Sequence, residues 1–125
     1  MKLLLDTHTY IWWLDDPAQL AEEARIAIAN PRNFVFVSAV SIIEIAIKQA
    51  KGKFQATEPP ESLLDTCRFR ELPLKIAHAS LLRDLPPVHK DPFDRMLAAQ
   101  ALAEGLTLVT RDPVMKDYAV PLIAA

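Results

Sequence analysis

Short apolar runs alternate along the chain with segments of helical spacing. The runs at 2–6 (KLLLD), 34–37 (FVFV) and 106–109 (LTLV) are apolar or β-branched almost throughout. Such runs are typical of strands that are covered on both faces of a parallel sheet. Shorter strands are expected around 72–74 and within 118–123, the latter at an edge of the sheet.

Apolar residues three and four positions apart mark the segments between these strands as helices. The helix over 92–104 has the clearest boundaries, because Asp91 can cap its start, Pro92 suits its first turn and Gly105 can end it. Alternating strands and helices predict a three-layer α/β/α fold with a mainly parallel central sheet. Helices are predicted over 9–14, 18–29, from Ser38 or Ser41 to about 51, 61–69, 75–85 and 92–104.

The length and composition indicate a globular chain. A length of 125 residues fits one domain, residues 1–125, and 51% hydrophobic with 24% charged residues are globular values. The single cysteine, Cys67, excludes an intrachain disulfide, and the apolar run at 3–5 is too short for a signal peptide. We therefore expect a cytoplasmic protein.

The charge balance limits how the chain can contact nucleic acid, and its glycine content excludes a P-loop. Sixteen acidic and fourteen basic residues give a formal charge of -2. The chain lacks the basic excess of many nucleic-acid binders, so any contact with nucleic acid must be local. Gly52 and Gly105 are the only glycines in the sequence, which excludes the glycine-rich phosphate cradle of a P-loop.

Glu44 is the most informative residue, because it is the only charge in the apolar segment 39–47 (AVSIIEIAI). A helix this apolar must be largely buried, and an unpaired buried carboxylate is costly or takes up a proton. Glu44 therefore needs a cation partner, a metal or a catalytic role. Taken alone, a buried salt bridge explains it as well as a catalytic function does.

Two further acids are placed where a site would form. Asp6 ends the first strand, where open parallel sheets generally bind their ligands, although a helix cap for the segment from Thr7 would also account for it. Asp94 lies in the first turn of the helix over 92–104. Its partners three, four and seven positions on are apolar, so it is expected to face inward.

The region after the strand at 106–109 offers a fourth acid. Asp112 lies either at the carboxyl edge of the sheet or in a simple turn before a proline. Asp117 competes with it, but its neighbours are typical of a solvated turn. Asp91 is better explained as a helix cap than as a ligand.

The parallel topology brings four acids toward one edge of the sheet. Carboxylates about 4 Å apart repel by about 4 kcal/mol per pair at an effective dielectric of 20, so a cation is needed to hold them together. Oxygen ligands without cysteine suit Mg²⁺ or Mn²⁺ better than zinc. The histidines form no ligand pair at useful spacing and are expected at helix ends or at the surface: His8, His78 and His89.

Four segments together resemble the PIN-domain family, and within it the VapC-like toxins of toxin-antitoxin modules. Their order, spacing and total length agree with the family over almost the whole chain. The resemblance implies four metal-site acids, of which the fourth is the most variable in the family: Asp6, Glu44, Asp94 and Asp112. It leaves Asp91 and Thr110 as candidates for an outer position around the metal. The segments are LLLDTHTYIWWL, SAVSIIEIAIK, HKDPFDRMLAAQA and LVTRD.

The same resemblance implies a Mg²⁺- or Mn²⁺-dependent endoribonuclease toxin, with RNA as substrate and a cognate antitoxin and a second copy of the chain as partners. In this interpretation Asp6 and Asp94 bind the metal, and Glu44 orients or deprotonates the attacking water. Asp112 completes the shell or a second metal site.

Basic and aromatic residues near the acids are candidates for RNA contact. Arg95 and Arg111 stand beside two of the acids, and Lys48 begins the basic end of the Glu44 helix. Solubilising charge explains the lysine equally well. Trp12 and Trp13 could stack on bases, although such a pair in an early helix more often belongs to a core or an interface.

Other classes of protein also place aspartates at strand ends. A receiver domain would need paired acids after its first strand, and a haloacid-dehalogenase-like phosphatase would need an acid where His8 stands. The alternatives that stay open are a catalytically inactive PIN-fold module that binds RNA or protein, and a housekeeping PIN nuclease. Metal-dependent RNA cleavage by the purified protein would separate the nuclease from the inactive module.

Overall fold

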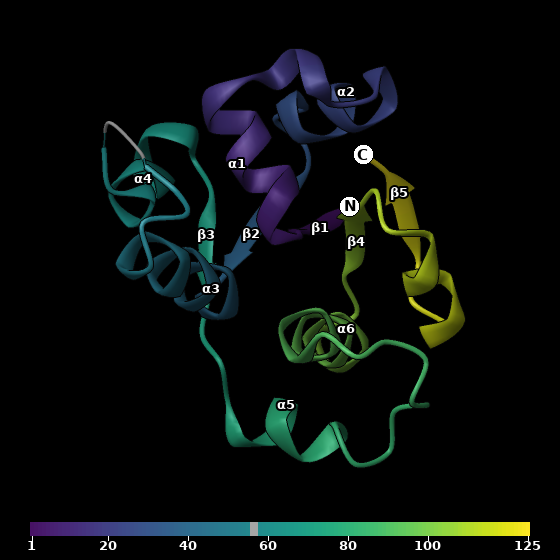
Figure 1. Ribbon diagram of the computed structural model, residues 1–125. Coiled ribbons are helices and arrows are strands. Elements are labelled where there is room, and N and C mark those ends of the chain that lie inside the picture. Colours follow the sequence, from purple (N-terminus) through teal and green to yellow (C-terminus); the bar gives the residue numbers. More distant parts are fainter. Residues whose placement is uncertain (56–57) are drawn as a thin grey trace.

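The computed structural model describes residues 1–55 and 58–125, and within them five strands form one sheet (Figure 1). The strand order is β3-β2-β1-β4-β5, and each neighbouring pair is parallel. The predicted parallel sheet is therefore confirmed. The strands are β1 (Lys2–Leu5), β2 (Phe34–Ser38), β3 (Arg70–Leu72), β4 (Thr107–Thr110) and β5 (Leu122–Ala124).

Helices cover both faces of this sheet, so the predicted three-layer fold is confirmed. Helices α1 and α2 lie on one face, and α6 with α5 lies on the other (Figure 1). The helices are α1 (Thr7–Asp15), α2 (Glu22–Ala29), α3 (Ala39–Ala50), α4 (Leu64–Cys67), α5 (Ile76–Leu81) and α6 (Pro92–Glu104). Shorter 3₁₀ turns are η1 (Pro17–Gln19), η2 (Pro60–Leu63) and η3 (Pro113–Tyr118).

The boundaries of α6 agree with the prediction. The Asp91 carboxylate accepts from the backbone N–H groups of Phe93 and Asp94, and Gly105 ends the helix at a φ of 66°. A positive φ of this kind carries little steric cost for glycine, which explains the residue at this position.

Several predicted elements differ from the structure in their bounds. The helix predicted over 18–29 begins only at Glu22, because Leu20 is extended. The helix predicted over 61–69 is a 3₁₀ turn followed by the short α4, which ends where Arg68 adopts a positive φ. The strand expected around 72–74 lies at 70–72, because Pro73 has no N–H with which to continue the ladder.

The helix predicted over 75–85 ends at Leu81, and the carbonyl of the next residue, Leu82, has a side-chain partner. That carbonyl would accept from the N–H of residue 86 in a continuing helix, but residue 86 is a proline. The Arg95 guanidinium donates to it instead, at 3.0 Å. A side chain of α6 thus takes the place of the missing backbone donor.

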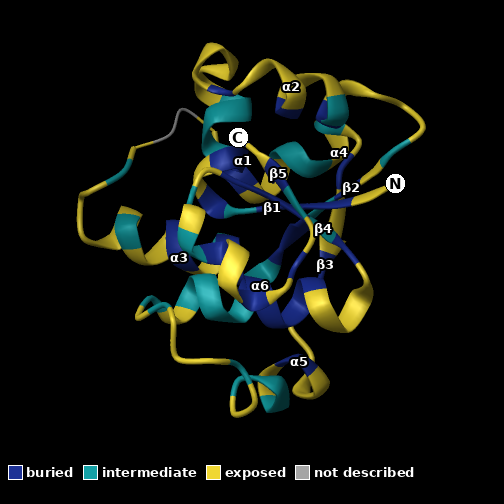
Figure 2. Ribbon diagram, turned by 90° about the vertical axis from the view of Figure 1, so that its right-hand side faces the viewer, coloured by how far each residue is buried: buried dark blue, intermediate teal, exposed yellow. Residues whose placement is uncertain are grey.

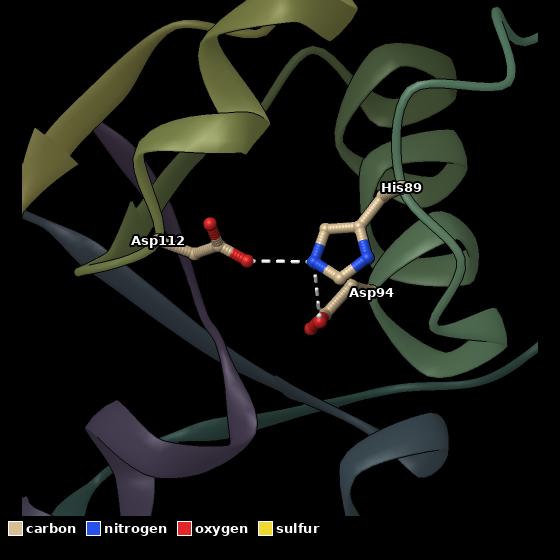
Figure 3. A group of neighbouring side chains, drawn as sticks. All are labelled: His89, Asp94 and Asp112. Carbon is tan, nitrogen blue, oxygen red and sulfur yellow. Dashed lines mark hydrogen bonds and ion pairs between the residues drawn. The ribbon is translucent and has the colours of Figure 1, made fainter.

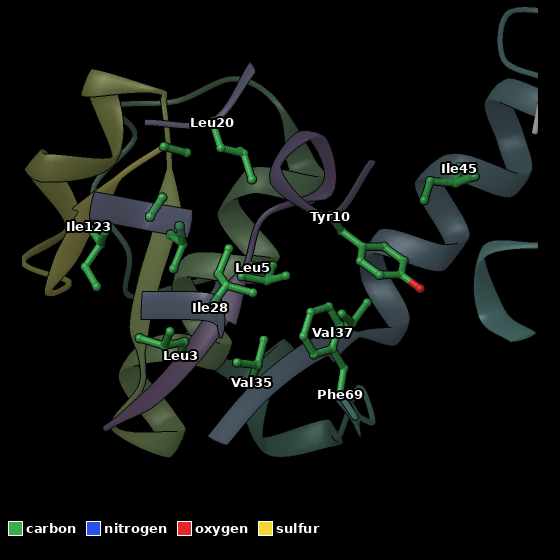
Figure 4. Packing of buried hydrophobic residues seen from close by; sticks show 13 residues of the cluster. Leu3, Leu5, Tyr10, Leu20, Ile28, Val35, Val37, Ile45, Phe69 and Ile123 are labelled. Atoms are coloured by element: carbon green, nitrogen blue, oxygen red, sulfur yellow. The ribbon is translucent and has the colours of Figure 1, made fainter. Parts of the chain in front are cut away.

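The alternation of side chains along β1 creates a core on each face of the sheet. Leu3 and Leu5 pack with residues of α1 and α2, as Figure 4 shows, whereas Leu4 packs with Leu97 and other residues of α6. All three leucines are fully buried. Figure 2 shows the same arrangement, with buried strands at the centre and exposed residues on the outer helices.

The register of the strands sets the positions of the residues that follow them. Leu5 of β1 pairs with Val37 of β2 and with Val109 of β4. Asp6, which comes next after Leu5, donates its backbone N–H to the carbonyl of Val109 at 3.1 Å. The ladder therefore extends to Asp6 and holds its backbone at the carboxyl edge beside Thr110. In the described parts of the chain, no helix combines the length and apolar character needed to cross a membrane.

A buried glutamine connects α6 to the strands. Gln100 is fully buried, its side-chain oxygen accepts from the Ser38 hydroxyl, and its side-chain nitrogen donates to the Pro73 carbonyl at 3.2 Å. These bonds link the helix that carries Asp94 to the ends of β2 and β3.

We expect Gln100→Leu to lower the free energy of unfolding by about 2 kcal/mol, because it keeps the apolar volume but removes the partner of two polar groups. Urea unfolding followed by circular dichroism measures the loss. Leu102→Gln on the same helix is the control, since Leu102 is 40% exposed and should change stability by less than about 0.5 kcal/mol. Equal stability of the two variants would contradict the structural role of Gln100.

Candidate active site

A cavity of about 400 Å³ lies at the carboxyl ends of β1 and β4, and we name it the carboxylate cavity. Three of the four predicted acids line it. Asp6 follows β1, Asp112 follows β4, and Asp94 comes from the first turn of α6. The described residues that line the cavity are Asp6, His8, Trp12, His89, Asp94, Arg111 and Asp112.

Asp6 and Asp112 each use their two carboxylate oxygens for two different purposes. Oδ1 of Asp6 accepts from the backbone N–H of Thr9 at 2.8 Å and so caps α1. Oδ1 of Asp112 accepts from the N–H of Val114 at 3.0 Å and caps η3. In both residues Oδ2 stays directed to other side chains of the site. The helix-cap explanation and the site explanation therefore hold together.

Thr110 connects these two acids. Its hydroxyl donates to Oδ2 of Asp6 at 2.5 Å and accepts from the backbone N–H of Asp112 at 3.1 Å. The residue is buried, so the hydroxyl has a fixed place between the ends of β1 and β4. The structure thus places Thr110 between Asp6 and Asp112.

The environment of Asp94 disfavours its charged form. Burial raises the pKa of Asp94 to about 7, with a further rise from the neighbouring charge of Asp91 and smaller ones from Asp6 and Glu44. His89 acts in the opposite direction. Negative charges that lie close together in a partly desolvated site repel one another, as expected for a cluster of carboxylates.

His89 lies between two of the acids, which differs from the prediction that the histidines lie at helix ends or at the surface. Its Nε2 is 2.6 Å from Oδ2 of Asp112 and 3.2 Å from Oδ2 of Asp94 (Figure 3). The backbone N–H of Asp91 donates to Nδ1 at 3.0 Å, so the proton of the neutral ring is on Nε2. His89 therefore donates a hydrogen bond to Oδ2 of Asp112, while Oδ2 of Asp94 lies within ion-pair distance of the same nitrogen.

Two side chains hold the segment that carries His89. Arg95 donates to the carbonyls of Leu82 and Pro86 at 3.0 Å each, and Tyr118 accepts from the backbone N–H of His89 at 3.0 Å. Arg95, a predicted RNA contact, is not among the described residues that line the cavity. Its guanidinium is occupied in shaping the path from α5 to α6.

The sequence carries a signal for the position of His89. His89 precedes the cap residue Asp91 by two positions, and that spacing lets the cap's own N–H fix the imidazole. The role of Arg95 depends on the missing donor at Pro86, which is also visible in the sequence.

Glu44 is buried in α3, with 6% of its surface exposed, and it is not among the described residues that line the cavity. Lys48, one helical turn on, approaches its Oε2 to 2.9 Å. A salt bridge therefore accounts for the buried charge of Glu44. Its partner is Lys48, which was predicted to contact RNA. Glu44 still lies close enough to the site to act on the pKa of Asp94.

Asp117 and Asp91 have the positions expected of accessory acids. Asp117 is exposed in η3 and is not a lining residue, whereas Asp112 is one. Asp91 caps α6, as predicted, with one carboxylate oxygen on two backbone N–H groups. The geometry thus favours Asp112 over Asp117 as the fourth acid.

The chemistry of the donors fits a hard divalent cation. Single ligand atoms of His89, Asp94 and Asp112 all lie within 4.8 Å of one another. In the tautomer described above, Nε2 of His89 carries a proton and has no lone pair for a metal. The carboxylates are the available ligands, and an oxygen-only set suits Mg²⁺ or Mn²⁺.

The fold and this cavity define a class of protein: a parallel α/β domain with a carboxylate site at the carboxyl edge of its sheet. The model of the PIN domain family matches residues 3–121, so the chain belongs to the PIN domain family, as its sequence segments predicted.

Known relatives agree with this assignment. The chain is 30% identical over 122 residues to Ribonuclease VapC22 of Mycobacterium tuberculosis, a match that covers 95% of this chain and 93% of that protein. The structure of VapBC2 from Rickettsia felis, bound to a DNA fragment from its promoter, is similar with a TM-score of 0.74 and 18% identity, covering 99% of this chain and 98% of that one. DNA-bound VapBC from Salmonella typhimurium gives a TM-score of 0.66 and 20% identity, with 99% and 98% covered. At these identities the two structures show the fold alone.

We expect Asp94→Asn to stabilise the metal-free protein more at about pH 8 than at about pH 5. The pKa of Asp94 rises from its ordinary value of 3.8 to about 7 on folding, so the folded state binds more protons between these values. The stability that the protonated form contributes is complete below the lower pKa and is lost as the pH rises through the upper one. Urea unfolding in EDTA at both pH values measures the difference, and an equal effect of the substitution at both would contradict the raised pKa.

Proposed function

We propose that the chain is a metal-dependent endoribonuclease that acts as the toxin of a toxin-antitoxin pair. The observation that carries the proposal is the meeting of Asp6, Asp94 and Asp112 in one cavity at the carboxyl edge of the sheet. The 30% identical relative is named a ribonuclease, and the match extends over nearly the whole of both chains.

Mg²⁺ or Mn²⁺ would be held by the carboxylates of Asp6 and Asp94, with Asp112 completing the site. When bound, the cation supplies Lewis-acid activation of a phosphodiester and of water. The other residues of the site position these acids. Thr110 holds Oδ2 of Asp6, and the caps of α1 and η3 fix the direction in which Asp6 and Asp112 point.

His89 and Glu44 would act on the substrate and on water. The Nε2–H of His89 is a neutral donor that lines the cavity and could serve a phosphate oxygen. Glu44 would orient or deprotonate the attacking water, and its ion pair with Lys48 would hold its carboxylate in one direction.

The proposal includes a cognate antitoxin, a homodimer and a cytoplasmic location. The similar structures from Rickettsia felis and Salmonella typhimurium are VapBC assemblies. A further similar structure, VapBC-1 from Haemophilus influenzae, has a TM-score of 0.67 and covers 99% of this chain. These likenesses support a protein partner without identifying it.

Asp94→Asn and Asp112→Asn are expected to lower Mg²⁺-dependent RNA cleavage by about 100-fold or more, because each removes a ligand charge from the site. Asp117→Asn is the matched control, since this acid of the same segment is exposed and outside the cavity. Cleavage is followed on denaturing gels with total RNA, and folding is checked by thermal denaturation. Full activity of folded Asp94→Asn would refute the proposed site.

Expression of the wild-type chain is expected to arrest bacterial growth, whereas expression of Asp94→Asn to the same level is not. Growth curves with matched induction measure the effect. Cleavage in vitro without any growth arrest would favour a housekeeping nuclease over a toxin.

A further inference from the structure

Part of the wall of the carboxylate cavity is aromatic rather than acidic. The ring centroids of His8 and Trp12 are 5.7 Å apart, with an angle of 40° between the ring planes. The guanidinium carbon of Arg111 lies 4.1 Å from the centroid of the Trp12 ring. All three residues line the same cavity as the acids, and we name them the aromatic platform.

The platform is held in place by the elements that also position the acids. His8 and Trp12 are four residues apart on α1, so they share a face of the helix that Asp6 caps. Arg111 follows β4 and precedes Asp112, and its guanidinium donates to the backbone carbonyls of Gln19 and Ala125. The relation between platform and carboxylates is therefore set by the ends of β1 and β4.

The two neighbouring tryptophans have different surroundings. Trp13 packs against Phe69 with a centroid separation of 6.1 Å and is not among the described residues that line the cavity. Trp12 packs partly against the same core but turns toward the cavity. The core explanation thus suits Trp13, while Trp12 has a surface that a ligand can reach.

Because the charged residues of the cavity are mostly acidic, a nucleic-acid strand would gain more from stacking on an aromatic ring than from attraction of its phosphates. Among the described lining residues, Asp6, Asp94 and Asp112 oppose a polyanion, and Arg111 alone carries a fixed positive charge. Attraction to phosphates is therefore weak on this wall. Stacking of a base on an aromatic or guanidinium surface does not depend on the charge balance and tolerates any base.

We propose that the aromatic platform binds an unpaired nucleobase of the strand whose phosphate lies at the carboxylates. The inference rests on the proposed function, which brings a phosphodiester into this cavity. A base within a duplex presents no free face, so the platform requires a strand that is single and unstacked at this position.

The test compares a fluorescein-labelled oligothymidylate of about twelve nucleotides with the same backbone lacking its bases, in MgCl₂, by fluorescence anisotropy. A denaturing gel at the end of each titration verifies that the strands are intact. The wild-type chain is expected to bind the base-carrying strand about 10-fold more tightly. Trp12→Leu should bring the two affinities within about 2-fold, because leucine keeps apolar volume but has no ring face.

Trp13→Leu is the matched control and should keep the wild-type preference, because its ring belongs to the core. His8→Ala provides a second variant at an exposed position, with an intermediate loss of preference expected, so that the test does not depend on the folding of Trp12→Leu. The dependence of binding on salt should stay the same in these variants, since no phosphate contact is removed.

A wild-type chain that binds both strands equally would overturn the platform, and so would a folded Trp12→Leu that keeps the full preference. Neither result bears on the nuclease, which the Asp94→Asn cleavage assay tests separately. A preference for bases in a protein that cleaves no RNA would support the platform and refute the proposed nuclease.

Discussion

Repulsion among carboxylates at the carboxyl edge of the sheet is the constraint to which the surrounding structure responds. Three acids from three segments line one cavity. Burial raises the pKa of Asp94 to about 7, and the negative charges of Asp91, Asp6 and Glu44 raise it further. Hydrogen-bond donors surround the acids of the cavity: the Thr110 hydroxyl on Asp6, the His89 imidazole on Asp112, and backbone N–H groups at the starts of α1 and η3. The hydroxyl and backbone donors orient the acids but carry no charge that could offset the repulsion between them. A cation is what can do that.

Helix capping and site formation are often treated as competing explanations of an aspartate, but here they cooperate. A carboxylate has two oxygens, and the cap uses Oδ1 of Asp6 and of Asp112 while Oδ2 serves the site. Capping restricts the side-chain torsions of both residues before any ligand arrives, which lowers the entropy lost when a cation or substrate binds. An acid at the start of a helix after a parallel strand is therefore more informative than its capping role suggests.

The layers and the parallel sheet followed from local patterns: apolar runs for β1, β2 and β4, and the residues Asp91, Pro92 and Gly105 at the ends of α6. The elements between 58 and 91 were less predictable, because their limits depend on distant partners such as Arg95 on the Leu82 carbonyl. The position of His89 could not be predicted for the same reason. It lies between two acids only where α6 packs in its place and Tyr118 accepts a hydrogen bond from the backbone N–H of His89. That Asp6, Asp94 and Asp112 lie at one edge of the sheet could be predicted, because strand ends and the first turn of a helix are local features. Glu44 was singled out correctly as a buried charge, but whether Lys48 satisfied it could not be decided from apolarity alone.

The fixed tautomer of His89 limits what this residue can do at the site. Its Nδ1 accepts from the N–H of Asp91, and that N–H belongs to the residue that caps α6, so the ring cannot change tautomer without losing this bond. Nε2 therefore stays a donor. It donates to Asp112 and lies near Asp94, and these are the two acids best placed to be ligands. A cation held by those acids would compete with His89 for the same oxygens, since both draw on the same carboxylate lone pairs. The imidazole N–H would then need another acceptor, and in a nuclease a phosphate oxygen has the charge to provide it.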